Sequence, residues 1–475
     1  MEFKYLIKNK TFNGVLIFCT FFIILSILKN PGQAIHAHSD EKTVVETAIR
    51  ISDGSLNPEF FRYPSGHMNI LALIYKITEF FSGELTKENL YSIAWVFSRI
   101  CIAGIAAMVF MICSINMNYY FGILGSVLTM LSTTLYTHAN FAIVDVPMAF
   151  FVTLFFLFLT FLYSKSDWHF KYIIILGFIA GIAIAMKYTA ALLIPALIFV
   201  SAEYVEKNRK LIISIKQIKK VLLILGMSLL MVSAMTKINQ QSLLDYFTGL
   251  TTDGILEIEY IRTLSNFNSF IMIIGILLII FSLWNKLVQS EWVRFLISPF
   301  HLFTIFIVII GFALFSPFTL IELKKSFADF MYEFRHMKIG SAAHYHHLSD
   351  EYRTFIANLS PTDSGIFYIN LIYHNLGIIG IILVFYGIYH MYLLEPAYST
   401  TIMIYLVLLL FTLFTWKNVA VRYTLSIFPI MIVFIMHGLF TVYQIISQKY
   451  SINKYSVAIL LYIIVLIHPI ANFIN

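Results

Sequence analysis

The sequence predicts an all-α polytopic membrane protein. Of its 475 residues, 59% are hydrophobic and only 12% are charged, and the mean hydropathy is +0.83. About a quarter of the residues of a soluble domain are charged, so this composition excludes an ordinary soluble protein. Apolar runs of about 20 residues, the length of a helix that crosses a bilayer, recur along the chain. Cys19, Cys101 and Cys113 lie inside such runs, which favours packing over a disulfide or a metal site.

The apolar runs predict about 13 membrane-spanning helices. The first run follows Lys4, Lys8 and Lys10 and is not followed by an A-x-A cleavage pattern. We therefore expect an uncleaved first helix with its N-terminus in the cytoplasm. The predicted spans are 11–28, 92–115, 119–137, 147–163, 172–187, 188–203, 220–236, 268–285, 300–318, 371–392, 398–415, 423–446 and 455–471.

The distribution of charge supports this topology. In the segments predicted to lie inside the cell, lysine and arginine clearly outnumber aspartate and glutamate, whereas the predicted outer segments are nearly balanced. Such an excess of basic residues is typical of cytoplasmic loops. The net charge of +7 therefore follows from membrane topology, and we expect no nucleic-acid partner.

Two predicted outer segments, 29–91 and 319–370, are too long to be simple connections. The first contains two amphipathic helical patterns, one carrying Lys42 and Arg50 on its polar face and one starting near Pro64. Both are too polar or too short to cross a bilayer, so we expect them to lie in the interface plane. The second segment is rich in charged residues and histidines. Because no internal repeat or linker is found, the whole chain, 1–475, is predicted to be a single domain.

Ionisable residues gather at the predicted outer ends of the spans. Asp40 follows the first span, Asp145 the third and Arg422 the eleventh, while Lys187 ends the fifth. Each odd-numbered span brings the chain to the outside, so these residues share one membrane face. Ionisable residues at membrane depth are costly and suggest function. Carboxylates together with cations suit chemistry on a phosphate-bearing, membrane-embedded substrate.

Five stretches resemble a bacterial GT-C glycosyltransferase, in the branch of the protein O-mannosyltransferases and the lipid A aminoarabinose transferase. In order, they are SDEKTVVETAIRISDG, FRYPSGHMNILALIY, FAIVDVPMAFFVTLFF, LGFIAGIAIAMKYTAALLIPAL and VRYTLSIFPIMIV. The resemblance implies a GT-C fold with interfacial helices in the first outer loop, which agrees with the topology above. The chain departs from the aminoarabinose transferase branch at Arg62–Tyr63, where that branch has an acid–lysine pair before the proline.

The resemblance also implies an activity. The donor would be a polyprenyl- or dolichyl-phosphate-linked sugar taken from the bilayer, and the acceptor a hydroxyl of lipid A, a glycan or a protein. Asp40 would deprotonate this hydroxyl, which would displace the lipid phosphate in one step with inversion at the anomeric carbon. We expect an enzyme of the bacterial inner membrane, surrounded by membrane lipids, with a periplasmic active site and no required cofactor.

Each candidate site residue also has a structural interpretation. Asp40 and Asp145 occupy helix-cap positions, and Glu41 would be favoured by the helix dipole in a first turn. The cations could instead reach the lipid headgroups by snorkelling. The candidates are Asp40, Glu41 and Asp145 for catalysis, Arg62, Lys187 and Arg422 for the donor phosphate, and Tyr63 and His67 for substrate binding.

Histidines raise the question of a metal. His36, His38 and Asp40 alternate along the chain, and a second group, 344–347, lies in the other outer segment. Some members of the wider superfamily bind a divalent cation through the acid of loop one and an acidic motif of loop two. Here loop two offers only Asp145 and no D-x-D pattern. We therefore predict no metal site, with a divalent cation as the alternative.

Two other function classes remain as alternatives. A transporter or flippase of lipid-linked sugar intermediates would have inverted repeats and polar residues near the midplane. A polytopic scaffold or a polymerase-type enzyme would leave the ordered family-like stretches unexplained. Because the ionisable residues collect at the outer ends, the sequence favours the glycosyltransferase.

Overall fold

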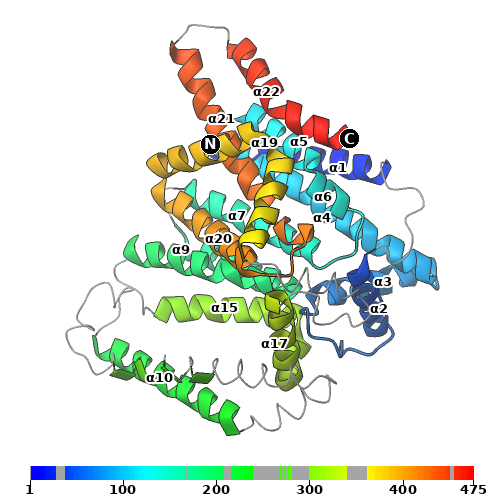
Figure 1. Ribbon diagram of the computed structural model, residues 1–475, viewed down its shortest axis with the longest axis vertical. Coiled ribbons are helices and arrows are strands. Elements are labelled where there is room, and N and C mark those ends of the chain that lie inside the picture. Colours follow the sequence, from blue (N-terminus) through cyan, green and yellow to red (C-terminus); the bar gives the residue numbers. More distant parts are fainter. Residues whose placement is uncertain are drawn as a thin grey trace. The chain divides into compact units, whose positions relative to one another are not determined.

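The computed structural model describes most of the chain as helices (Figure 1). The described residues are 2–27, 38–165, 168–207, 215–238, 299–339, 361–449 and 454–474, with several residues between 268 and 280. Within these ranges the regular structure is α-helical or 3₁₀-helical, and no strand occurs. The predicted all-α class is therefore confirmed.

Among the described residues, seven helices are long and apolar enough to cross a membrane, and five further helices contain shorter apolar stretches. A multi-pass membrane protein is thus supported, whereas the predicted count of about 13 spans stays a prediction. The predicted span 268–285 lies largely outside the described residues. The seven are α1 (Glu2–Ile27), α4 (Lys87–Asn116), α7 (Asp145–Tyr163), η1–α9 (Tyr188–Lys207), α19 (Pro361–Leu394), α20 (Pro396–Thr415) and α21 (Ile427–Lys449). The five are α5 (Tyr119–Leu131), α8 (Phe170–Met186), α10 (Ile215–Ile238), α15 (Pro299–Phe315) and α22 (Lys454–Ile474).

The chain divides into two compact units. The first comprises Met1–Leu197, Ile307–Ile321 and Phe330–Asn475, and it holds every candidate site residue. The second comprises Ile198–Phe306 and Glu322–Asp329. The prediction of a single domain stays a prediction.

Within the first unit, glycines allow two pairs of helices to approach closely. A side chain at Gly387 of α19 would collide with the backbone of Phe434 in α21, and one at Gly438 would meet the backbone of Leu383. Small residues at helix crossings let backbones pack against each other in membrane proteins. Gly181 of α8 and Gly311 of α15 form a second crossing of this type. These contacts fix the helices that carry the site.

The first predicted outer segment folds as the sequence suggested, with one correction. Helices α2 (Ser39–Ser52) and α3 (Gly66–Ser82) pack together through a buried apolar cluster that includes Val44, Val45 and Leu71. Asp40 is not the cap of α2: His38 occupies that position, and its side chain accepts the Asp40 backbone N–H. Asp40 instead lies in the first turn, where its carboxylate is available to other partners.

Three further elements complete the surroundings of the site. The 3₁₀ turn η4 (Val421–Thr424) connects α20 to α21, and the short helix α6 (Thr133–His138) precedes the loop before α7. Helix α17 (Leu323–Ile339) belongs to the second predicted outer segment, and its part from Phe330 onward lies in the first unit. The histidines at 344–347 lie outside the described residues, as does His36.

Candidate functional site

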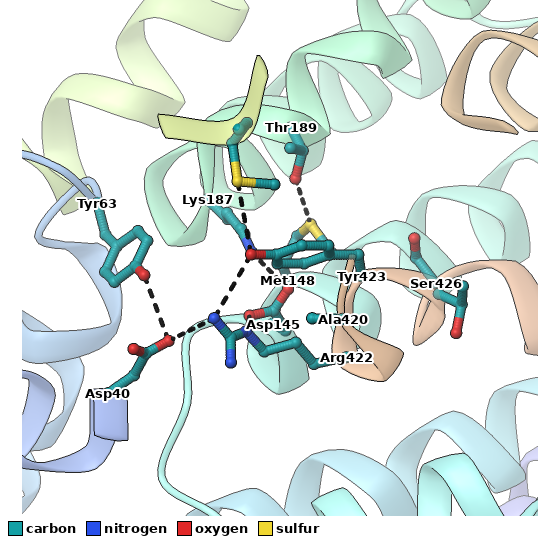
Figure 2. Close-up of polar contacts among 12 residues, drawn as sticks. Asp40, Tyr63, Asp145, Met148, Lys187, Thr189, Ala420, Arg422, Tyr423 and Ser426 are labelled. Atoms are coloured by element: carbon teal, nitrogen blue, oxygen red, sulfur yellow. Dashed lines mark hydrogen bonds and ion pairs between the residues drawn. The ribbon is translucent and has the colours of Figure 1, made fainter. Parts of the chain in front are cut away.

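Four residues predicted from the sequence converge in the structure (Figure 2). Lys187 Nζ lies 2.5 Å from Asp145 Oδ1, and Arg422 Nη2 lies 3.1 Å from Asp40 Oδ2. Arg422 Nε is also 3.8 Å from Asp145 Oδ2. We call Asp40, Asp145, Lys187 and Arg422 the ion cluster. The predicted gathering of these distant residues at one place is therefore observed.

Helix ends position the most deeply buried ion pair. Asp145 is the first residue of α7, where the positive end of the helix dipole favours a carboxylate. Lys187 follows the last residue of α8, where the negative end favours a cation. The exposed fractions of the two side chains are only 1% and 9%. Removing one partner of such a pair would leave a buried, uncompensated charge, which is strongly destabilising.

Arg422 lies between the two carboxylates of the ion cluster. It extends from η4, and its Nη1 lies 2.9 Å from His38 Nε2. Burial opposes the charge of Arg422, but Tyr423, Asp40 and Asp145 outweigh this effect, and the pKa of the guanidinium is raised. Arg422 therefore remains a cation that holds both acids.

Tyr63 contacts the ion cluster directly. Its hydroxyl donates to Asp40 Oδ2 over 3.3 Å. Burial and then the negative charge of Asp40 raise the pKa of the Tyr63 phenol well above its usual value. The phenol is therefore a neutral hydrogen-bond donor at physiological pH, and it fixes one oxygen of Asp40 in place.

Glu41, a predicted catalytic residue, has a different environment. Its side chain is fully buried and accepts hydrogen bonds from Trp95 Nε1 at 2.8 Å and from Ala142 N at 2.9 Å. It also accepts from the backbone N–H of His38 and so completes the cap of α2. These contacts connect α2 with α4 and with the loop before α7. Glu41 is thus placed to position Asp40 rather than to contact a substrate.

His67 and Arg62 lie apart from the ion cluster. The His67 ring is fully buried and stacks on Phe97 with 5.6 Å between ring centroids. Burial lowers the pKa of His67 to about 3, so the ring is neutral. Within the described residues both of its nitrogens lack a hydrogen-bond partner, so no hydrogen bond connects it to the ion cluster. Arg62 stacks on the ring of Tyr332, 4.0 Å from the centroid, at the edge of a cavity.

This cavity lies beside the ion cluster and has a volume of about 60 Å³, enough for ordered water or part of a ligand. Aromatic side chains form most of its wall, so we call it the aromatic cavity. It shares Lys187, Tyr63 and Tyr423 with the ion cluster and its direct surroundings. The full lining is Arg62, Tyr63, Lys187, Tyr188, Thr189, Phe330, Glu333, Phe334, Met337, Trp416 and Tyr423.

Glu333 is the carboxylate of the aromatic cavity, and the sequence did not single it out. Burial raises its pKa, while Lys187 and Arg62 act in the opposite direction. Phe330, Glu333 and Met337 recur at helical spacing along α17, so they share one face of the helix. This spacing was the only signal in the sequence, and it does not reveal what the face contacts.

The residues present do not fit a divalent cation held between the two acids. Within the described part of the chain, no group of three His, Cys, Asp or Glu side chains could hold a metal. Arg422 already occupies the space between Asp40 and Asp145, and Lys187 neutralises Asp145 further. A dication there would have to displace a guanidinium against strong charge repulsion.

Comparisons with known proteins found similarity to glycosyltransferases. The model of the family described as dolichyl-phosphate-mannose-protein mannosyltransferase (PMT) matches residues 79–244. The comparison with curated proteins gave no match.

Two solved structures of Archaeoglobus fulgidus share the fold. One is the oligosaccharyltransferase AglB in complex with an inhibitory peptide and a dolichol-phosphate, at 11% identity and a TM-score of 0.53. The matched region covers 98% of this chain and 55% of the AglB chain. The other, an oligosaccharyltransferase in complex with Zn and sulfate, has 10% identity and a TM-score of 0.50, with coverages of 97% and 52%.

The chain spans about half the length of these two proteins. At this identity the likeness shows the fold alone, which the chain shares with these two oligosaccharyltransferases. The match to the PMT family model over residues 79–244 agrees with the resemblance found in the sequence: this part of the chain is similar to the dolichyl-phosphate-mannose-protein mannosyltransferases.

Proposed function

We propose that this protein is an inverting glycosyltransferase of the bacterial inner membrane. It would transfer a sugar from a polyprenyl-phosphate donor to an acceptor hydroxyl at the periplasmic face. The observation that carries this proposal is the ion cluster, in which two carboxylates, an arginine and a lysine meet beside the aromatic cavity. The PMT match and the GT-C fold support the same class of reaction.

The proposed reaction has one step. Asp40 accepts the proton of the acceptor hydroxyl while the hydroxyl oxygen forms a bond to the anomeric carbon of the sugar. The bond between that carbon and the phosphate oxygen breaks, and its electron pair stays on the lipid phosphate. Arg422 and Lys187 stabilise the negative charge that develops there. The anomeric configuration is inverted because the attack and the departure occur on opposite faces.

Asp145 has a supporting role in this proposal. Its two oxygens face Lys187 and Arg422, so both are engaged by cations. A carboxylate held in this way keeps the two cations in place and limits their net charge. Asp40 is the better candidate for the base because it lies at the edge of the ion cluster and is less buried, with 18% of its side chain exposed.

The aromatic cavity is the proposed place for the sugar or the acceptor. Aromatic rings offer apolar faces to sugar rings, and a carboxylate such as Glu333 can accept hydrogen bonds from hydroxyls. The solved AglB complex contains a dolichol-phosphate and a peptide, which supports a lipid-phosphate donor and leaves a protein acceptor open beside lipid A and glycans.

The test uses the full-length protein in detergent with a purified, radiolabelled polyprenyl-phosphate sugar. We expect the wild type to consume the donor and Asp40→Asn to lose at least about 100-fold in transfer rate, since the amide cannot take the proton. Asp53→Asn, the same change on an exposed acid at the end of α2, is the matched control and should transfer normally.

The same assay separates the enzyme from a transporter. Only an enzyme consumes the donor in the absence of sealed vesicles. Unchanged transfer by Asp40→Asn would remove Asp40 as the base. If the protein moves the donor across the membrane of sealed vesicles without consuming it, the protein is a flippase and the proposed enzyme activity is wrong.

A further inference from the structure

Arg99 is a buried cation that the proposed reaction does not use. It lies about three turns into α4, one of the helices long and apolar enough to cross a membrane. Only 6% of the residue is exposed. Its Nε and Nη2 both donate to Oδ1 of Asn140, over 3.2 and 3.1 Å. A neutral amide oxygen is thus the partner of a full positive charge.

Within the part of the chain that the structure describes, no carboxylate pairs with Arg99. The group whose charge acts on its guanidinium is the phenol of Tyr136, and none of the acids of the ion cluster does so. A charged side chain at membrane depth is costly unless an opposite charge compensates it. A negative group that lies near Arg99 must therefore come from outside these residues.

The guanidinium of Arg99 also has unused donors. Its contact with Asn140 uses one edge, formed by Nε and Nη2. The end of the guanidinium, where one N–H of Nη1 lies parallel to one of Nη2, makes no hydrogen bond to the described residues. This pair of N–H groups has the geometry that binds two oxygens of a phosphate.

The free end of the guanidinium reaches the lipid-facing surface of α4. Nη1 has no partner among the described residues and yet is not a buried atom, so it is accessible. Arg99 lies one turn after Val96 and next to Ile100, two exposed apolar residues. Helix side chains lean towards the N-terminal end, which the charge bias predicts to lie outside. Arg99 therefore points towards the outer headgroups.

We propose that Arg99 binds the phosphate of an anionic phospholipid of the surrounding bilayer, at a site separate from the ion cluster. Two charge-assisted hydrogen bonds would run from Nη1 and Nη2 to phosphate oxygens, and the lipid would supply the missing negative charge. An anionic lipid fits better than a zwitterionic one, because only a net negative charge compensates the cation. This inference does not rest on the proposed function, which needs a phosphate at the ion cluster alone.

The proposed lipid site is connected to the ion cluster through one loop. Asn140 belongs to the segment between α6 and α7, shortly before Asp145. The next residue, Phe141, packs against the ring of His38 with 5.5 Å between ring centroids. A phosphate that fixes the guanidinium of Arg99 also fixes its contact with Asn140. The bound lipid therefore stabilises the loop that leads to Asp145.

The test titrates phosphatidylglycerol into the full-length protein in detergent and follows the first bound lipid by native mass spectrometry. We expect Arg99→Gln to weaken this binding at least about tenfold, because hydrogen bonds to a charged group are lost. Arg99→Lys keeps the charge without the planar fork, so its affinity should lie between those of the other two proteins. Arg50→Gln, the same change at an exposed arginine of α2, is the matched control and should bind as the wild type does.

Thermal unfolding gives a second readout. In detergent without phospholipid, Arg99→Gln should have a thermal midpoint no lower than that of the wild type, since it has no uncompensated cation. Phosphatidylglycerol should raise the midpoint of the wild type more than that of the variant. Diacylglycerol, which lacks the phosphate, should affect both proteins equally.

The outcomes distinguish this inference from the proposed function. If Arg99→Gln binds phosphatidylglycerol like the wild type, or if Arg99→Lys binds no better than Arg99→Gln, the inference is overturned. It also fails if Arg99→Gln weakens the binding of polyprenyl phosphate but not that of phosphatidylglycerol, because the site then belongs to the donor lipid. If phosphatidylglycerol binds through Arg99 but the wild type does not consume the sugar donor, the inference stands and the proposed function is wrong.

Discussion

At the scale of single residues, the guanidinium of Arg422 connects three other residues of the site. Arg422 contacts Asp40, lies within 3.8 Å of Asp145 and faces His38. A cation that is shared among several partners can change partners at little cost, because each lost contact is replaced by another. The arrangement therefore combines a firmly held lysine, buried with Asp145, and an arginine able to follow the charge of a substrate.

Glu333 gives a pH prediction at the same scale. Its pKa in the folded protein is raised by burial above the unfolded value of about 4.3. The folded state therefore binds the proton of the Glu333 carboxyl group more tightly than the unfolded state does. The stabilisation from this protonated group is fully present below about pH 4 and is lost as the pH rises through the folded pKa. Glu333→Gln stays neutral at every pH. Its thermal midpoint should equal that of the wild type at about pH 4 and be higher than that of the wild type at about pH 8.

The control for this prediction is Glu84→Gln, the same change on an exposed glutamate between α3 and α4. The thermal midpoint of Glu84→Gln should change between the two pH values by the same amount as that of the wild type. If Glu333→Gln shows no greater stability than the wild type at the higher pH, the Glu333 carboxylate is not desolvated as the structure indicates.

At the scale of elements, Glu41 connects α2 to the rest of the first unit. Replacing it by alanine leaves the buried N–H group of Ala142 without its acceptor, at a cost of about 1–3 kcal/mol, and removes the acceptor of the partly buried Trp95 N–H as well. We expect Glu41→Ala to lower the thermal midpoint and to expose the α2 region to limited proteolysis. Asp40→Asn, which keeps a side chain of the same shape, should do neither.

If Glu41→Ala is as stable as the wild type but inactive, Glu41 has a direct catalytic role instead of a positioning one. A loss of both stability and activity, partly recovered by Glu41→Gln, would support positioning. The amide oxygen can still accept from Trp95 and Ala142, which both donate to Glu41 Oε1, whereas the bond from the His38 backbone N–H to Oε2 is lost.

The helices of the first outer segment show what a sequence can predict about elements. The spacing of apolar residues predicted α2 and α3. The sequence offered Asp40 as a cap because it precedes the helix and its carboxylate could accept backbone N–H groups. Only the folded structure shows that a ring nitrogen of His38 accepts the backbone N–H of Asp40 and caps α2.

At the scale of the whole molecule, span counting was enough to predict that Asp40, Asp145, Lys187 and Arg422 meet. The alternation of spans fixes the face on which each residue emerges, and a compact bundle brings such residues close. Glu333 and Tyr423 were not predicted, because their place depends on how α17 and η4 pack rather than on where a span ends. The charge pattern of a helix does not identify the cavity that it faces.

Membrane orientation gives a prediction at this scale. The charge bias predicts that the ion cluster lies outside and the turn after α7 inside. In a background lacking the three native cysteines, Asp53→Cys should react with a membrane-impermeant maleimide in intact spheroplasts. Ser164→Cys, also on an exposed position, should react only after permeabilisation. The reverse pattern would invert the topology and place the proposed chemistry on the cytoplasmic side.

The crossing of α19 and α21 has a consequence for evolution. Gly387 and Gly438 allow these helices to meet in one register, and Arg422 lies only a few residues before α21 begins. A helix advances about 1.5 Å per residue, so a one-residue slip at the crossing would displace Arg422 by half the length of its bond to Asp40. Changes at two glycines far from any substrate could therefore abolish activity, and selection on catalysis would act on them as strongly as on the charged residues.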